Sequence, residues 1–164
     1  MDLKIYGLDD LILTAIKSEV EAKKVYDTLA DRVKNALLKD RLKFLSGEEE
    51  KHRLFFEDLF RNQFPQRNLV LPEKSPVPLP EITPEDLDRP IPEILAKAMD
   101  AEKAAHEFYL GLVPRFEHDT EIQHHLLYIA SMELTHYRIL EIEKENAEKF
   151  DAYDEEWPMT HIGP

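Results

Sequence analysis

Two short motifs in the chain place a histidine three residues after a glutamate: Glu49 with His52, and Glu133 with His136. If both motifs are helical, each pair lies on one helix face and directs a carboxylate and an imidazole to the same point. Carboxylates and imidazoles are ligands of iron, manganese and zinc. A single Glu-x-x-His motif occurs often by chance, so the elements that carry these residues decide its meaning.

Apolar residues recur every three or four positions through four long segments, which is the period of an amphipathic helix. We expect helices at about residues 8–33, 36–62, 91–117 and 120–149. One glutamate stands near the middle of each apolar face; the four are Glu19, Glu49, Glu102 and Glu133. The two histidines lie on the same faces as their glutamates, so we expect the acids and imidazoles inside the protein.

The ends of these helices have recognisable signals. Asn35 can cap the second helix, and Thr120 with Gln123 has the pattern of a capping box for the fourth. Pro92 stands in the first turn of the third helix, where its missing N–H group costs nothing. Pro114 is expected to kink or end the third helix.

The second half of the chain repeats the first. The third segment matches the first at an offset of 83 residues, and the fourth matches the second at an offset of 84. The polar positions repeat too: Glu19 with Glu102, Tyr26 with Tyr109, Glu49 with Glu133, and His52 with His136. A helical hairpin alone leaves its apolar face in water, so we expect the two hairpins to pack together as an all-α four-helix bundle.

A proline-rich stretch separates the two hairpins. Eight of the eleven prolines lie between Pro65 and Pro92, so residues 63–90 are expected to be an extended crossover rather than a helix. Helices of about 25 residues span roughly 38 Å at 1.5 Å per residue. An extended chain of about 28 residues exceeds that length at roughly 3.1 Å per residue. The crossover can therefore run the length of the bundle, which makes the second and third helices parallel.

Four glutamates near the axis of such a bundle need compensation, because buried like charges repel and lose their hydration. Two divalent cations would balance four carboxylates, and a mixed carboxylate and imidazole shell suits iron or manganese better than zinc. In the alternative interpretation, each glutamate reaches the surface or pairs with a lysine on a neighbouring helix. The recurrence of the acids in all four helices favours the metal site. The predicted ligands are Glu19, Glu49, His52, Glu102, Glu133 and His136.

Tyr26 and Tyr109 lie one heptad after Glu19 and Glu102. From there a phenol could hydrogen-bond a ligand carboxylate, or it could be an ordinary core tyrosine. We take both tyrosines as candidates for contact with the metal ligands. The other five histidines are expected at the surface; they are His106, His118, His124, His125 and His161.

The composition restricts the function further. The 164 residues include 34 acidic and 21 basic ones, for a formal net charge of −13, and 43% are hydrophobic, as in a globular domain. An acidic chain is unsuited to nucleic acid or to an anionic membrane. The absence of cysteine excludes disulfides, zinc ribbons, iron–sulfur clusters and thiol nucleophiles. No apolar run approaches the roughly 20 residues of a membrane helix, and the first residues lack the order of a signal peptide, so we expect a cytoplasmic protein.

The motifs resemble those of the ferritin-like diiron carboxylate proteins, and of the rubrerythrins most closely. One glutamate from each of the first and third helices, with Glu-x-x-His from the second and fourth, is the ligand set of that superfamily. The resemblance covers about residues 8–145. It implies a ferritin-like bundle with two iron ions, or manganese, that reacts with peroxide or O2 as an oxidase, peroxidase or ferroxidase.

Two features depart from that resemblance. Typical rubrerythrins have another glutamate one turn after the third-helix ligand, where this chain has Ala105. We therefore expect His52 to be a constant ligand rather than one that exchanges with that acid. Rubrerythrins also commonly carry a cysteine-ligated rubredoxin domain, which a chain without cysteine cannot form. Electrons are then expected from an external donor protein such as a rubredoxin, or from substrate iron.

Two other functions stay open at this point. The chain could be a ferritin-type protein that oxidises and stores iron, or a non-enzymatic helical interaction bundle whose acids only solvate the surface. We also expect a homodimer or a higher homo-oligomer. The tail at residues 150–164 contains Phe150, Tyr153 and Trp157, and we expect it to dock on the bundle or on a partner subunit, with disorder as the alternative.

Overall fold

The computed structural model describes residues 3–156, and these residues form an all-α bundle without a strand. Three 3-10 helices accompany the long helices: η1 before α1, η2 near the end of the crossover, and η3 directly after α3. The expected all-α four-helix bundle is confirmed. The elements are η1 (Leu3–Ile5), α1 (Leu8–Arg32), α2 (Ala36–Gln63), η2 (Asp86–Asp88), α3 (Ile91–Leu112), η3 (Val113–Phe116) and α4 (Thr120–Glu156).

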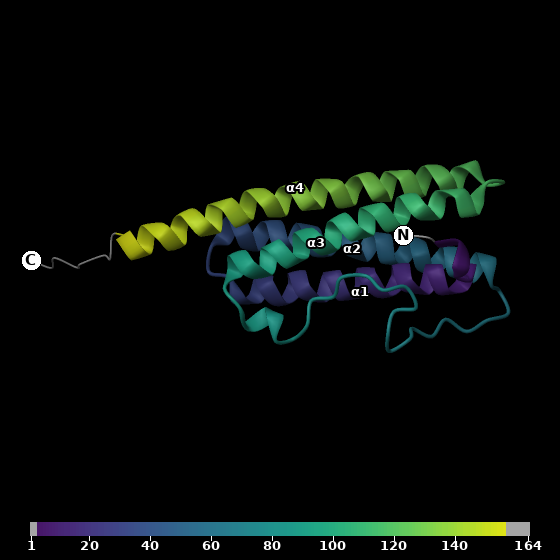
Figure 1. Cartoon of the computed structure of the whole chain (residues 1–164), viewed down its shortest axis with the longest axis horizontal. Coiled ribbons are helices and arrows are strands. Elements are labelled where there is room, and N and C mark those ends of the chain that lie inside the picture. The colour runs from purple at the N-terminus through teal and green to yellow at the C-terminus, as the bar shows by residue number, and fades with distance from the viewer. Residues whose placement is uncertain (1–2, 157–164) are drawn as a thin grey trace, which may run out of the picture.

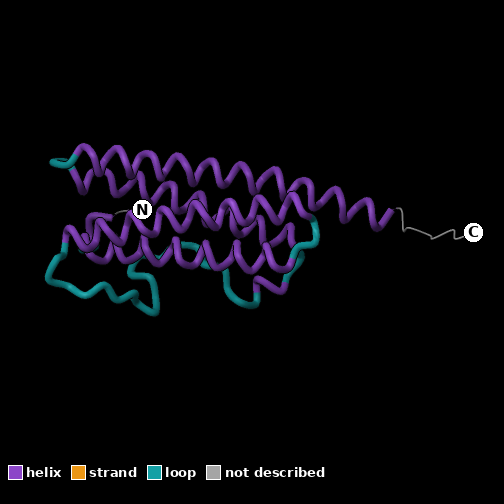
Figure 2. The backbone as a smooth tube through the Cα atoms, turned by 180° about the vertical axis from the view of Figure 1, so that it is seen from behind, coloured by secondary structure: helices purple, strands orange, loops and turns teal. Residues whose placement is uncertain are grey.

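The helices pack lengthwise as two antiparallel hairpins, α1 with α2 and α3 with α4. Figure 1 shows that α2 and α3 run in the same direction, because the crossover between them returns along the whole bundle. Seen from behind in Figure 2, the crossover again lies on the α1 side, away from α4. None of the described helices combines the length and the apolarity needed to cross a membrane.

The apolar interior is divided into two clusters along the bundle. One cluster contains Leu11, Ile16, Phe56 and Leu112, and the other contains Leu29, Leu42, Leu45 and Leu95 among its buried residues. The six predicted ligands occupy the sequence positions between these two clusters on every helix. A polar layer is therefore enclosed between two apolar ones, which exclude water from it and keep its side chains close together.

The ends of α2 and α3 agree with the sequence patterns. The Asn35 side chain accepts hydrogen bonds from the N–H groups of Leu37 at 3.0 Å and Leu38 at 3.1 Å, so it caps α2. Pro92 stands within the first turn of α3. The helix ends at Leu112, and Pro114 lies in the 3-10 turn that follows, since its ring cannot continue an α-helix.

The predicted capping box of α4 is wrong. Asp119, and not Thr120, caps this helix, because its Oδ1 atom accepts the N–H of Ile122 at 3.0 Å. The Gln123 side chain, which the box would turn back to its own helix, instead donates to the Val113 carbonyl at 3.3 Å. The N-cap is therefore an aspartate one position before the threonine that the sequence pattern predicted.

α4 also continues to Glu156, beyond the expected end at residue 149. Residues 144–156 are rich in Glu, Lys and Ala, which are strong helix formers, and contain no proline. The expected change of structure at Phe150 is therefore wrong. The proposed docking of Phe150, Tyr153 and Trp157 concerns side chains that lie outside the described part of the chain.

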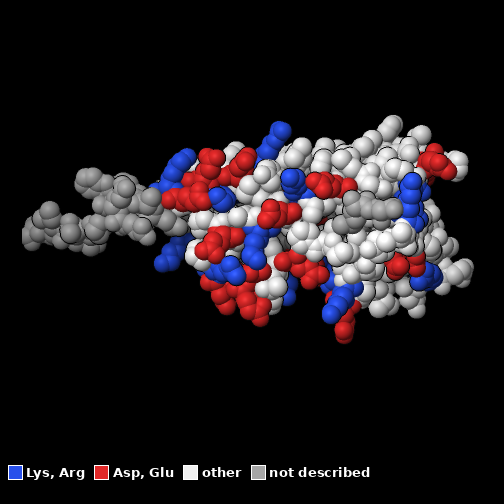
Figure 3. Space-filling view, in the orientation of Figure 1, with Lys and Arg blue, Asp and Glu red and all other residues white. Residues whose placement is uncertain are grey.

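The visible face of the bundle carries many charged side chains beside larger uncharged areas (Figure 3). Figure 3 shows acidic and basic side chains intermixed over the visible face, with many acidic groups among them. Many of the Lys and Arg ion pairs join residues of one helix near the surface, such as Arg61 with Glu57, and such pairs contribute at most about 1 kcal/mol each. The fold therefore depends on the apolar clusters rather than on surface salt bridges.

Candidate metal centre

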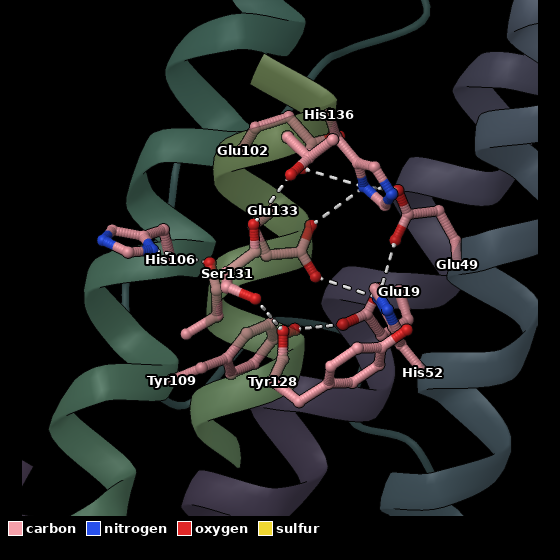
Figure 4. Close-up of polar contacts among 12 residues, drawn as sticks. Glu19, Glu49, His52, Glu102, His106, Tyr109, Tyr128, Ser131, Glu133 and His136 are labelled. Atoms are coloured by element: carbon pink, nitrogen blue, oxygen red, sulfur yellow. Dashed lines mark hydrogen bonds and ion pairs between the residues drawn. The ribbon is translucent and has the colours of Figure 1, made fainter. Parts of the chain in front are cut away.

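The six predicted ligands converge in the polar layer, and Figure 4 shows their carboxylates and imidazoles turned toward one another. All six are buried, and none exposes more than 4% of its surface. Glu19 comes from α1 and Glu102 from α3, while α2 and α4 each supply one Glu-x-x-His pair. The helical spacing of three residues therefore does bring each histidine beside its own glutamate.

The first half of the centre surrounds His52. Its Nδ1 atom lies 2.9 Å from Oε1 of Glu133, 3.5 Å from Oε2 of Glu49 and 3.8 Å from Oε2 of Glu19. Three helices thus place one imidazole nitrogen and three carboxylate oxygens around a common point. Such a group of four donor atoms is suited to a divalent cation.

The second half surrounds His136 in the same manner. Its Nδ1 atom lies 3.1 Å from Oε1 of Glu49, 3.3 Å from Oε2 of Glu133 and 3.7 Å from Oε2 of Glu102. The two imidazole rings are stacked, with 5.7 Å between their centroids. The internal repeat of the sequence therefore appears as two matching halves of one centre.

Glu49 and Glu133 belong to both halves. Each presents one carboxylate oxygen to the group around His52 and the other oxygen to the group around His136. Within each group of four residues, the candidate ligand atoms all lie within 4.8 Å of one another. If each group held an ion, the two ions would share Glu49 and Glu133, and each would have one further glutamate and one histidine.

Several of these buried atoms have no hydrogen-bond partner among the described residues. They include both oxygens of Glu49, one oxygen of Glu133 and the Nδ1 atoms of both histidines. Their separations are short, but their orientations do not make hydrogen bonds. An unpaired buried polar group costs about 1–3 kcal/mol, and more if it is charged. Converging carboxylate and imidazole atoms without hydrogen-bond partners are what a cation would satisfy, so these residues and their geometry fit a metal pair.

Two tyrosines hold the remaining carboxylates from the opposite hairpin. The Tyr26 hydroxyl on α1 donates to Oε1 of Glu102 on α3, and the Tyr109 hydroxyl on α3 donates to Oε1 of Glu19 on α1. Each bond occupies one oxygen and leaves Oε2 directed toward the histidine of its half. The expectation that a phenol contacts a candidate ligand is therefore confirmed, and each contact crosses between the hairpins.

Residues 10–144 match the family model of rubrerythrin. The chain belongs to the rubrerythrin family, which is a ferritin-like diiron family. A solved structure of a hypothetical protein from Pyrococcus furiosus is similar, with 30% sequence identity and a TM-score of 0.77. The alignment covers 90% of this chain and 94% of that one. No curated protein matches the chain.

Burial changes the protonation of this rubrerythrin-family centre in its metal-free form. Burial, followed by the negative charge of Glu49, raises the pKa of Glu19 to about 8. Burial, followed by the charges of Glu19 and Glu102, raises the pKa of Glu133 to about 8 as well. The hydroxyls of Tyr26 and Tyr109 also have pKa values well above the usual one, through burial and the nearby carboxylates, so they remain hydrogen-bond donors.

The two histidines respond in the opposite sense. Burial alone would lower the pKa of His52, but the carboxylates of Glu133, Glu19 and Glu49 outweigh it and raise the pKa to about 12. Burial likewise opposes the charge on His136, and its surrounding carboxylates again raise the pKa. Burial would raise the pKa of Glu102, yet contact with His136 lowers it. Protons therefore neutralise much of the metal-free cluster, and a metal must displace them.

A cavity of about 40 Å³ lies against the carboxylates between α1 and α3. All four glutamates of the centre line it, and neither histidine does. Tyr26 and residues 80–82 of the crossover also line it, together with four alanines, which are Ala22, Ala98, Ala101 and Ala105. The cavity leaves one side of the candidate metal pair accessible to a small molecule.

Sequence reasoning treated Ala105 only as a missing glutamate and did not recognise the cavity. The repeat does pair Ala22 with Ala105 at the offset of 83 residues, which is the one signal that small residues recur beside the acids. No sequence pattern indicated that residues 80–82 of the crossover line the cavity, because their position depends on how the crossover packs against α1 and α3.

The other histidines lie away from the centre, and one of them differs from expectation. His106 is half-buried, and its Nδ1 atom lies 2.6 Å from the Ala130 carbonyl, so its assignment to the surface is wrong. The contact joins α3 to α4. His118, His124 and His125 are exposed as expected, and His161 lies outside the described residues.

Proposed function

We propose that this rubrerythrin-family chain binds two iron ions, or two manganese ions in their place, and uses them to reduce peroxide or O2. The observation that carries the proposal is a pair of candidate ligand groups that share Glu49 and Glu133. Several of their buried oxygen and nitrogen atoms have no hydrogen-bond partner among the described residues. Oxygen-rich ligand shells with a few imidazoles are typical of iron and manganese.

The two sites would divide the ligands symmetrically. One ion would be held by Glu19 and His52 and the other by Glu102 and His136, with Glu49 and Glu133 between them. Four carboxylates and two divalent cations sum to zero charge, which removes the repulsion that protons relieve in the metal-free protein. The tyrosine hydroxyls would fix the orientation of the two end glutamates.

Two ferrous ions held there would supply one electron each to H2O2, whose O–O bond breaks as it takes up two protons and leaves as two waters. The protein's part is to position and to enclose. The apolar clusters on both sides keep bulk water from the carboxylates. The small cavity provides space for a ligand of a few atoms beside all four glutamates.

Electrons for repeated turnover would come from outside the chain, because the sequence has no cysteine with which to bind an iron–sulfur or rubredoxin centre. We propose a small electron-donor protein such as a rubredoxin, in the cytoplasm. A homodimer or higher homo-oligomer is part of the proposal. Large exposed apolar side chains on α2 and α4 support it; they include Phe44, Leu54, Leu127, Tyr128 and Ile142.

The test begins with metal-free protein and anaerobic addition of Fe(II). We expect two irons to bind per chain and to raise the melting temperature, since metal binds the folded state preferentially. One equivalent of H2O2 per pair of irons should then oxidise both, as followed by the visible absorption of ferric iron. Removal of the iron with a chelator should reverse the gain in stability.

Two neighbouring glutamates provide a matched pair of variants. Glu49→Gln should abolish binding of two irons, whereas Glu48→Gln should not, because Glu48 lies outside the centre and pairs with Lys51. Iron uptake far beyond two per chain in a large hollow assembly would instead indicate a ferritin-type storage protein. Absence of stoichiometric metal and of any chelator effect would indicate a non-enzymatic helical bundle.

A further inference from the structure

The crossover is attached to the bundle at two places, on either side of the cavity. At the first, Val77 is fully buried and its N–H group donates to the Thr14 hydroxyl of α1 at 3.4 Å. The Ser75 hydroxyl donates to the Val77 carbonyl at 2.6 Å. Thr14 in turn donates to the Asp10 carbonyl at 2.8 Å, so this attachment is joined to the backbone of α1.

The second attachment is centred on Asp86. This buried carboxylate lies 2.9 Å from the Lys97 ammonium group of α3 and accepts the N–H of Thr83 at 3.1 Å. The guanidinium group of Arg32, at the end of α1, donates to the carbonyls of Leu87 and Arg89. The crossover is therefore bound to α1 and α3 together on this side.

Between these attachments, residues 78–82 form a segment that we call the strap. Within the described residues the strap makes no hydrogen bond to the helices. It is held by packing of Leu79 against the apolar cluster of Leu11 and Phe56 and of Ile82 against the cluster of Leu29 and Leu95. Pro80, Glu81 and Ile82 line the cavity beside the carboxylates. The strap is thus the one cavity wall that is neither helical nor hydrogen-bonded.

The strap also borders a larger groove that adjoins this cavity. The groove has a volume of about 250 Å³ and extends along α1 to Thr83, Pro84 and Leu87. Groove and cavity share four lining residues, which are Glu21, Val25, Glu81 and Ile82. Glu21 is paired with Lys17 at 2.5 Å, so the passage between the two spaces is not strongly charged on the α1 side. A molecule that enters from the groove meets these four residues, of which Ile82 belongs to the strap.

The size of the inner cavity limits what can reach the carboxylates. A water molecule occupies about 30 Å³ in the liquid. A cavity of about 40 Å³ therefore accommodates a ligand of two or three heavy atoms, whereas an aryl ring needs a cavity of about 150 Å³. Ala98, Ala101 and Ala105 are the small residues that line it from α3, and Ile82 lines it from the crossover together with Pro80 and Glu81.

We propose that the strap, through Ile82, together with Ala105 on α3, selects the oxidant by size: H2O2 or O2 enters the cavity, and organic hydroperoxides are excluded. The proposal rests on the proposed function, because it assigns the substrate class of that same centre. Neither Ile82 nor Ala105 is a candidate metal ligand; Ile82 lines the cavity from the crossover and Ala105 lines it from α3.

The first test compares the iron-loaded, reduced Ile82→Ala protein with the unchanged protein, using H2O2 and cumene hydroperoxide as oxidants. Removing the larger side chain should raise the rate with cumene hydroperoxide relative to H2O2 at least tenfold, as expected when a pocket gains several carbon atoms of space. The control is Ile139→Ala, because Ile139 packs against the same apolar cluster but does not line the cavity. An unchanged ratio in Ile82→Ala, or an equal change in Ile139→Ala, would overturn the proposal.

The second test measures binding rather than turnover. Ala105→Val adds two methyl groups to the cavity wall, so the oxidised iron-loaded protein should bind azide at least tenfold more weakly at an unchanged iron content. Ala104→Val is the control, since Ala104 does not line the cavity. If no variant reacts with any peroxide but azide binding follows the pattern, the proposed function fails and the cavity assignment stands. If H2O2 reacts normally and azide affinity is the same in Ala105→Val, the size selection fails alone.

Discussion

At the scale of single residues, the candidate centre contains carboxylates and imidazoles that crowd together while several of their buried atoms have no hydrogen-bond partner among the described residues. In a protein interior such groups are normally hydrogen-bonded, so a cluster of them is costly unless a ligand is bound. The exceptions are the oxygens of Glu19 and Glu102 that accept tyrosine hydroxyls. In each of these two glutamates, one oxygen therefore binds a tyrosine hydroxyl and the other is available to a metal.

Replacing Tyr26 with phenylalanine should weaken metal binding while it preserves the fold. The change removes the donor to Glu102 and frees that carboxylate to rotate away from His136. Loss of such a supporting hydrogen bond typically lowers metal affinity about 10- to 100-fold. Competition of Fe(II) or Co(II) between the protein and a chromophoric chelator measures the affinity.

The control for this change is Tyr137→Phe. Tyr137 is half-buried on α4 and has no polar contact among the described residues, so its variant should bind metal as the unchanged protein does. Equal affinities for Tyr26→Phe and the unchanged protein would show that the hydroxyl of Tyr26 does not orient a ligand.

At the scale of elements, each helix has a distinct task. α2 and α4 each supply a Glu-x-x-His pair, while α1 and α3 each supply one glutamate and one tyrosine that reaches the opposite hairpin. The helices must therefore keep their register to within part of a turn. The capped start of α2 contributes to that register, because Asn35 satisfies two N–H groups that no helical carbonyl can reach.

Asn35→Ala should lower the free energy of unfolding by about 1 kcal/mol, which is the usual loss for an N-cap side chain. Urea unfolding followed by circular dichroism measures it. Asn62→Ala is the matched control, because Asn62 is exposed near the end of α2 and makes no hydrogen bond among the described residues. Its effect should stay within about 0.5 kcal/mol, as is usual for surface changes. A loss in Asn35→Ala no larger than that of the control would remove the capping role.

At the scale of the whole molecule, protons and metals compete for one buried cluster. Glu19 and Glu133 have pKa values of about 8 in the folded metal-free protein, against about 4.3 for an exposed glutamate. His52 has a pKa of about 12, against about 6.5 when exposed. All three groups hold protons that the unfolded chain would already have released.

The stability of the metal-free protein should therefore fall as the pH rises from about 5 to about 8. Groups with raised pKa values contribute stability that is complete below their unfolded values and is lost as the pH approaches their folded values. The melting temperature of metal-free protein across this range tests the prediction. Metal affinity should rise over the same range, because the ions bind only deprotonated ligands.

The metal-free double variant Glu19→Gln, Glu133→Gln should show a flatter dependence on pH, since amides do not titrate. The carboxylates with lowered pKa values, such as Asp86, act in the opposite sense but only at more acidic pH. A melting temperature that is constant or rises between about pH 5 and 8 in the unchanged metal-free protein would contradict the assigned protonation.

Much of this protein could be predicted from the residues in order. The period of the apolar positions predicts the helices, and the proline-rich stretch predicts the crossover and the parallel direction of α2 and α3. The convergence of four glutamates with two histidines could also be predicted, because spacing along a helix determines which side chains share a face; the glutamates are Glu19, Glu49, Glu102 and Glu133.

Other features were decided only by tertiary packing. Tyr26 bonds the glutamate of the other hairpin, Asp119 rather than Thr120 caps α4, and Ile82 closes a cavity lined by Ala105. Each depends on atoms brought together across the bundle or in a local turn, and no helical period determines such distances. The sequence by itself determined which residues form the candidate centre, because helix geometry is regular. The tertiary structure decided how their oxygens are shared and which side stays open, because those depend on how two hairpins and a crossover pack.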